Sequence, residues 1–116
     1  MRVLVCGARD WRDQGFVYRV LDTMHATKGF TLVITGGAPG ADRFGKNWAL
    51  DRGIATDTFQ ADWARLGLAA GPIRNQRMIQ EGKPDLVVAF PGGKGTADMV
   101  ARADRAGVPV EKVGWR

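Results

Sequence analysis

The segment that most constrains the fold is an apolar run that ends in glycines and leads into a helical pattern. The run at 85–90 is followed by Pro91-Gly92-Gly93-Lys94-Gly95-Thr96, and the helical pattern begins at Thr96. Glycine lets the backbone take left-handed angles and lets a ligand approach closely, while the free N–H groups at a helix start carry partial positive charge. This junction therefore predicts an anion site, with a nucleotide or nucleotide derivative as the favoured ligand.

A second junction of the same kind lies earlier in the chain. The strand pattern at 31–35 leads into Gly36-Gly37-Ala38-Pro39-Gly40-Ala41-Asp42, and a helical stretch at 42–52 follows. Neither junction is a Walker A loop, because no lysine followed by Ser or Thr comes after the last glycine in the required way. The dinucleotide-binding fingerprint is also incomplete, since no acidic residue clearly ends the next strand.

Strand and helix patterns alternate along the whole chain. Strands are expected at 2–6, 31–35, 54–59, 86–90 and 108–113, and helices at 13–28, 42–52, 73–81 and 96–106, with Pro72 marking the start of the third helix. Single helices between strands favour a parallel sheet covered on both faces. The predicted fold class is α/β: a Rossmann-like, doubly wound, mainly parallel five-stranded sheet flanked by helices. Ligands of such folds bind outside the carboxyl ends of the strands, where both glycine junctions lie.

Length and charge limit the domain organisation and the partners. The 116 residues, 45% of them hydrophobic, are enough for one domain at 1–116 and too few for two. The formal net charge of +5 favours phosphate-bearing partners. The basic residues are scattered, however, so nucleic-acid binding is an alternative that the pattern does not specifically indicate.

The cysteine and histidine content limits metal chemistry and covalent chemistry. Cys6 lies in the first apolar run and is expected to be a buried hydrophobe, and together with His25 it is too little for a zinc site. No metal or cofactor is therefore expected. No apolar run approaches the roughly 18 residues of a membrane span, and no leader pattern opens the sequence, so a soluble, cytoplasmic protein without a membrane partner is expected.

Six short motifs are similar to those of one family of nucleotide-binding domains. They are Gly7-x-Arg9-Asp10, Gly36-Gly37-Ala38-x-Gly40-Ala41-Asp42, Ala61-Asp62-Trp63, Gly71-Pro72-x-Arg74-Asn75, Lys83-Pro84-Asp85 and Pro91-Gly92-Gly93-x-Gly95-Thr96. Over nearly its whole length the chain resembles the SLOG superfamily of Rossmann-like domains, which includes the LOG phosphoribohydrolases and DprA. It is most similar to the small single-domain, YspA-like (cpYpsA-related) branch. The resemblance implies a nucleotide pocket built from the glycine loops, usually in a homodimer.

The resemblance leaves catalysis open. LOG enzymes cleave the N-glycosidic bond of nucleoside 5′-monophosphates with a motif similar to PGGxGTxxE and an upstream arginine, to which Arg74 corresponds. Met99 stands at the position of the glutamate, and the nearest carboxylate is that of Asp98. One residue along a helix turns a side chain by about 100°, so Asp98 projects from another face. Arg74 and Asp98 are the candidate catalytic residues, with Asp42 and Asp10 as alternative carboxylates.

The expected ligand-binding residues lie on the loops after three strands and near the start of one helix. They are Gly7, Arg9, Asp10, Gly36, Gly37, Gly40, Ala41, Asp42, Arg74, Asn75, Gly92, Gly93, Lys94, Gly95 and Thr96. Ordinary structural roles are the alternatives for several of them: a helix cap for Thr96, a helix-dipole partner for Asp42, and a surface ion pair for Arg9 and Asp10. Trp11 and Trp63 fall in predicted loops, which favours base stacking or a dimer contact for one of them.

Three functions are compatible with these residues. The leading hypothesis is a sensor or sequestering module that binds a nucleotide-derived molecule, either related to ADP-ribose or NAD or a cyclic nucleotide. The first alternative is a phosphoribohydrolase acting on nucleoside 5′-monophosphates. The second is single-stranded nucleic-acid binding, as the DprA-like branch implies.

Overall fold

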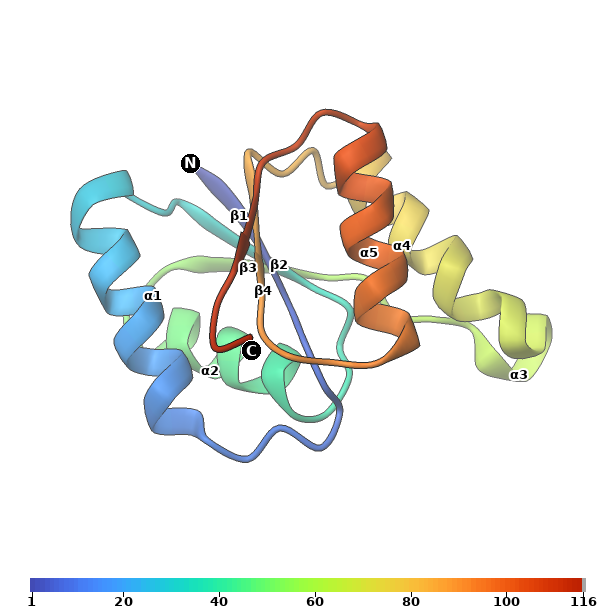
Figure 1. The fold of residues 1–116 in the computed structure, drawn as a ribbon, viewed down its shortest axis with the longest axis horizontal. Helices are drawn as coiled ribbons and strands as arrows, with labels where there is room; N and C mark the ends of the chain where they lie inside the picture. The colour runs from blue at the N-terminus through green and yellow to red at the C-terminus, as the bar shows by residue number, and fades with distance from the viewer. Residues whose placement is uncertain (116) are drawn as a thin grey trace.

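The core of the protein is one sheet of five parallel strands. The computed structural model describes residues 1–115, and its strands are β1 (Arg2–Cys6), β2 (Leu32–Thr35), β3 (Ala55–Thr58), β4 (Leu86–Ala89) and β5 (Val110–Lys112). Every neighbouring pair is parallel, in the order β3-β2-β1-β4-β5. Figure 1 views this sheet nearly edge-on, in the middle of the molecule. The predicted α/β, doubly wound, five-stranded fold is confirmed.

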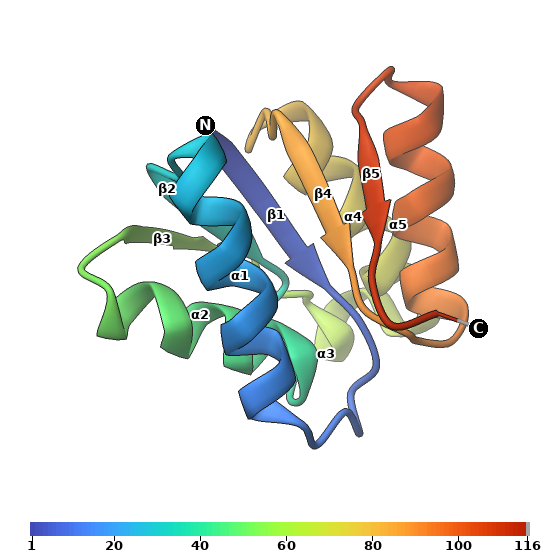
Figure 2. The same ribbon diagram turned by 60° about the vertical axis from the view of Figure 1, so that its left-hand side comes forward.

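Helices cover both faces of this sheet. They are α1 (Gln14–Lys28), α2 (Ala41–Asp51), α3 (Trp63–Leu66), α4 (Ala70–Gln80) and α5 (Lys94–Arg105), with a 3₁₀ turn, η1 (Gly67–Ala69), between α3 and α4. Helices α1 and α2 pack on one face, and α4 and α5 on the other (Figure 2). Within residues 1–115, no helix has both the length and the apolar character that a membrane crossing requires.

Alternation along the strands divides the core into two layers. Successive side chains of a strand point to opposite faces. In β1, Val3 and Val5 therefore pack in the layer that contains Trp48 of α2, while Leu4 and Cys6 pack in the layer of α4 and α5. Strand β4 has every residue buried, as a central strand covered on both faces requires.

The strand order places a crevice between β1 and β4. From β1 the chain winds outward through β2 to β3, and it then returns to place β4 on the other side of β1. The loop after β1 leads to α1 on one face, and the loop after β4 leads to α5 on the opposite face (Figure 2). Loops that diverge in this way leave a ligand-binding crevice at the carboxyl edge of a doubly wound sheet.

Most element boundaries agree with the sequence predictions to within one residue, and the larger differences lie in the second half of the chain. Helix α4 begins at Ala70 rather than at Pro72, because a proline is tolerated anywhere in a first turn, where the N–H has no intrahelical partner. Helix α5 begins at Lys94 after Gly93, so Thr96 is not its cap. The predicted polar loop at Asp62 contains the short helix α3, which the Asp62 carboxylate caps by accepting from the Arg65 N–H at 3.2 Å. Strand β5 is shorter than expected, at 110–112.

A pair of glycine variants tests whether the loops at the carboxyl edge are closely packed. Gly40 and Gly107 have similar positive φ, 76° and 75°, but a Cβ at Gly40 would meet the Ala8 carbonyl and the Arg9 backbone, whereas a Cβ at Gly107 would meet nothing within 4 Å. Gly107→Ala is expected to lower the free energy of unfolding by about 1 kcal/mol through the backbone alone. Gly40→Ala is expected to lose about 1 to 3 kcal/mol more. Equal losses in urea denaturation would contradict the packing argument.

Candidate functional site

A pocket of about 650 Å³ lies at the crevice between β1 and β4. Its volume falls within the range of about 300–1,000 Å³ that is typical of small-molecule sites. The loop after β1, the first half of α5 and one side of α4 form most of its walls. The predicted site residues that line it are Gly7, Arg9, Asp10, Asp42, Arg74, Asn75, Gly93, Lys94, Gly95, Thr96 and Asp98.

The start of α5 forms an open end of this pocket. The first backbone N–H groups of a helix have no intrahelical partner. Within residues 1–115, no protein acceptor takes up the N–H of Lys94, Gly95 or Thr96. A Cβ at Gly93 or Gly95 would meet no atom within 4 Å, so both positions are open to an approaching molecule. Free N–H groups, the helix dipole and the Lys94 ammonium all favour an anion here.

The other glycines of the edge hold the loops against one another. A Cβ at Gly7 would meet those of Ala41 and Phe90, and one at Gly92 would meet the Thr96 side chain. The Ala8 N–H donates to the Pro91 carbonyl at 2.8 Å, and the Ala8 carbonyl accepts from the Ala41 N–H at 3.2 Å. Gly40, Ala41 and Gly92 therefore have packing roles, and the structure does not bring them to the pocket wall.

Asp42 fixes the loop after β2. Its buried carboxylate accepts from the N–H groups of Gly36, at 3.0 Å, and Ala38, at 3.4 Å. Arg74 secures the same loop from the other side, because its Nη1 donates to the Gly36 carbonyl at 2.6 Å. Burial raises the pKa of Asp42 to about 6, against the opposing effects of the Ala38 N–H and of Arg74. Partial burial lowers the pKa of Arg74. The negative charge of Asp42 acts against this shift, and the positive charge of Arg9 adds to it.

A chain of hydrogen bonds joins the two candidate catalytic residues. Arg74 Nε donates to Asn75 Oδ1 at 3.0 Å, and Asn75 Nδ2 donates to Asp98 Oδ2 at 2.9 Å. Arg102 Nε donates to the same Asp98 oxygen at 2.8 Å. Partial burial acts to raise the pKa of Asp98, but the bonds from Arg102 and Asn75 outweigh it, and the net shift is downward. Asp98 is therefore suited to remain a carboxylate rather than to donate a proton.

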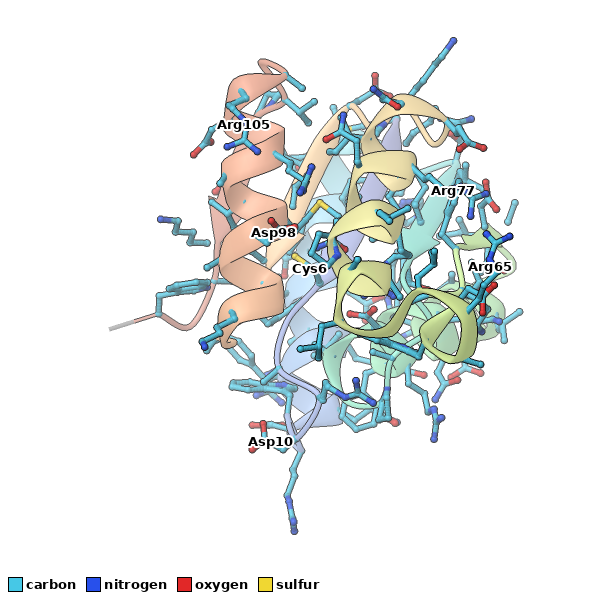
Figure 3. The ribbon with its side chains drawn as sticks, turned by 90° about the vertical axis from the view of Figure 1, so that its right-hand side faces the viewer. Cys6, Asp10, Arg65, Arg77, Asp98 and Arg105 are labelled. Carbon is cyan, nitrogen blue, oxygen red and sulfur yellow. The ribbon has the colours of Figure 1, made fainter. Side chains whose placement is uncertain are left out.

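Asp98 lies on the side of α5 that faces α4, Cys6 ends β1 in the sheet behind these helices, and Asp10 lies at the tip of the loop after β1 (Figure 3). Cys6 is a buried free thiol, and burial strongly raises its pKa, as expected for a residue of the core. Met99, which occupies the position of the LOG glutamate, is 1% exposed in the layer of α4 and α5. Among the described residues there is no group of three or more His, Cys, Asp or Glu arranged to hold a metal ion.

The two loop tryptophans have different surroundings. Trp11 packs with Phe16 and Phe90, with ring centroids 5.9 and 6.2 Å away, so it belongs to the aromatic part of the core. Trp63 is 46% exposed and lines the pocket. Of the two, Trp63 is thus in a position to contact a base.

Sequence reasoning missed the apolar wall of the pocket. This wall includes Leu68, Met78 and Met99, which sequence periodicity assigns only to helix faces or loops. Leu68 is 91% exposed, and nothing in the local sequence distinguishes it from an ordinary surface leucine. No local pattern in the chain brings α4 and α5 together over the crevice.

A smaller pocket adjoins the first one. It has a volume of about 180 Å³ and is lined by the remaining predicted site residues, Gly36 and Gly37, together with Gln60 and residues of the larger pocket, Arg9 and Arg74 among them. The structure thus divides the predicted site residues between two adjacent pockets and the packed loops behind them.

The raised pKa of Asp42 predicts how stability depends on pH. The folded protein holds the Asp42 proton more tightly than the unfolded chain, since the pKa rises from 3.8 to about 6 on folding. The free energy of unfolding of the wild type, measured relative to that of Asp42→Asn, is expected to fall by about 3 kcal/mol as the pH rises from about 4 to about 6. Above that range the difference is expected to level off. Urea denaturation of both proteins across this range is the measurement, and a constant difference would contradict a raised pKa.

Comparison with known proteins agrees with the fold and the motifs. A model of the YspA, cpYpsA-related SLOG family matches residues 1–66, which run from β1 through α3 and include the loops after β1 and β2. The Gene 61 protein of Mycobacterium phage D29 is 36% identical over 121 aligned positions, which cover 97% of this chain and 96% of that protein. The match to this family suggests a function related to nucleotides. The chain belongs to the YspA, cpYpsA-related SLOG family.

Proposed function

We propose that the protein binds a nucleotide or nucleotide-derived small molecule in the 650 Å³ pocket, as a sensor or sequestering module. The observation that carries the proposal is the open start of α5, where the N–H groups of Lys94, Gly95 and Thr96 have no acceptor within residues 1–115. A phosphate at this position would accept from these groups and lie beside the Lys94 side chain.

The opposite wall of the pocket suits the rest of a nucleotide. Trp63, Leu68 and Met78 contribute apolar surface, and Trp63 offers an exposed ring for stacking. Asn75 lies between the two walls, with its amide held by Arg74 and Asp98. A pocket with one cationic end and one apolar end matches the two chemically distinct ends of a nucleoside phosphate.

A bulky substitution at Gly95 tests where the phosphate binds. Gly95 lies in the first turn of α5, where leucine is a better helix former than glycine and a Cβ would meet no protein atom. Gly95→Leu is therefore expected to keep or raise the free energy of unfolding and to weaken nucleotide binding at least about tenfold, because the side chain blocks the pocket. Isothermal titration with AMP, cyclic AMP, NAD and ADP-ribose measures binding. Gly15→Leu is the control, because Gly15 is the exposed second residue of α1, as Gly95 is the second residue of α5, and it lines neither pocket.

Two results would count against this proposal. If none of these probes, nor the corresponding guanine nucleotides, binds the wild type, the pocket is not a nucleotide site. If Gly95→Leu binds a probe as tightly as the wild type does, the phosphate does not lie at the start of α5.

Hydrolysis of the N-glycosidic bond is the second candidate function. It is favoured by the chain of hydrogen bonds from Arg74 through Asn75 to Asp98, which places a guanidinium and an ionised carboxylate along one pocket. Glycoside cleavage passes through an oxocarbenium-like state, which a nearby carboxylate stabilises. Met99, buried at the glutamate position of the LOG motif, argues against this candidate.

This second candidate is tested by incubating the protein with nucleoside 5′-monophosphates and measuring the release of free base by chromatography. If the protein is a hydrolase, Asp98→Asn is expected to lower the rate of release about 100-fold or more. Asp104→Asn, on the exposed side of the same helix, is the matched control and is expected to leave the rate unchanged. No base release by the wild type would exclude the hydrolase and leave binding alone.

A further inference from the structure

The smaller pocket is a distinct compartment beside the proposed nucleotide site. It has a volume of about 180 Å³, and Arg9, Ala38, Trp63 and Arg74 line both pockets, so the two are adjacent. Because a water molecule occupies about 30 Å³ in the liquid, this space holds a group of a few heavy atoms but not a nucleobase with its sugar. Any occupant would be one small substituent of a ligand whose main part lies in the larger pocket.

The charges that line the smaller pocket are all of one sign. Arg9 and Arg74 both contribute to its wall, and none of its lining residues is acidic. Arg9 is exposed and has no hydrogen bond or ion pair with any protein group in the described part of the chain. The charge of Arg9 also acts to lower the pKa of Arg74, as expected for two cations that are close enough to repel each other, although the buried Asp42 carboxylate behind them acts more strongly in the opposite direction. An anion between the two guanidinium groups would replace this repulsion with two favourable interactions.

The geometry of Arg74 is suited to such an anion. Its Nη1 is held by the Gly36 carbonyl at 2.6 Å and its Nε by Asn75 Oδ1 at 3.0 Å, so the plane of the guanidinium is fixed before any ligand arrives. Its Nη2 has no acceptor within residues 1–115 and remains available as a donor. A pre-oriented guanidinium loses little conformational freedom when it binds a phosphate.

The glycines of the loop after β2 keep this compartment open. A Cβ at Gly36 would come within 2.5 Å of Arg74 Nη1, and one at Gly37 would come within 2.7 Å of Gln60 Nε2. Side chains at these positions would therefore displace the groups that line the pocket. The Gln60 amide, which also lines it, supplies a further donor.

We propose that the smaller pocket is a second phosphate subsite, and that the natural ligand is a nucleotide bearing two separate phosphoryl groups, as in a nucleoside 3′,5′-bisphosphate. One phosphate occupies the start of α5, and the second binds between Arg9 and Arg74. This inference rests on the proposed function, because the first phosphate and the nucleoside lie in the larger pocket. It adds to the proposed function the class of nucleotide that is bound, because the larger pocket alone does not distinguish nucleotides with one phosphoryl group from those with two.

Paired titrations test this inference. Wild-type protein is titrated calorimetrically, at one ionic strength, with a nucleoside 5′-monophosphate and with the corresponding 3′,5′-bisphosphate, for adenosine and for guanosine. For at least one base, the bisphosphate is expected to bind at least tenfold more tightly. Arg9→Gln is expected to lower this ratio by at least about threefold, because it removes one of the two guanidinium contacts and leaves Arg74 in place. The variant is expected to remain folded, since Arg9 is exposed. Arg12→Gln is the control, because Arg12 is an exposed arginine three residues further along the same loop that lines neither pocket.

The possible outcomes separate this inference from the proposed function. Tight binding of monophosphates with no preference for the bisphosphates leaves the proposed function in place and overturns the second subsite. An equal loss of preference in Arg9→Gln and Arg12→Gln also overturns it, because the effect would then reflect net charge alone. If neither class of nucleotide binds, both the second subsite and the proposed function are wrong.

Discussion

The site depends on close packing between loops that follow different strands. Ala8, after β1, donates to the Pro91 carbonyl after β4 and accepts from the Ala41 N–H at the start of α2. Residues without bulky side chains at these contacts let the backbones approach within hydrogen-bonding distance. Three segments that are far apart in sequence are thereby fixed at one edge of the sheet. The walls of both pockets, and the orientation of the groups in them, follow from this arrangement.

The polar side chains behind the pocket mainly form hydrogen bonds within the protein that stabilise its loops and helices. Asp42 accepts hydrogen bonds from the loop after β2, and Arg74 donates to the same loop. Asp98 is bound by Asn75 and Arg102. Groups with fixed partners are well suited to orient a ligand without reorganisation when it binds. The same bonds make proton transfer less favourable, since the pKa of Asp98 is lowered rather than raised. The chemistry of the site therefore supports binding more strongly than hydrolysis.

Two sets of donors take no part in these structural hydrogen bonds, and both are suited to bind an anion. The N–H groups at the start of α5 and the guanidinium of Arg9 lack protein partners in the portion of the chain that the structure describes. The residues at the start of α5 line the larger pocket, and Arg9 lines both pockets. The net charge of +5 favours anions near the protein in general, whereas these donors favour an anion at particular positions. The homodimer expected from the family resemblance stays a prediction, because the structure contains one chain.

The sequence by itself determined the fold and the edge of the sheet where a ligand would bind. Alternating strand and helix patterns lead to a parallel doubly wound sheet, and the glycine motifs after β2 and β4 mark its carboxyl edge. Only the tertiary structure decided which of those glycines are open. A Cβ at Gly93 or Gly95 would meet free space, whereas a Cβ at Gly7 or Gly40 would meet residues of segments that are distant in the sequence. Both kinds look alike in the sequence, because their difference lies in which distant segments pack against them. The same holds for the bonds from Arg74 to the Gly36 carbonyl and from Asn75 to Asp98, which join separate elements. The ion pair of Asp98 with Arg102 is different, because its i,i+4 spacing can be read from the sequence.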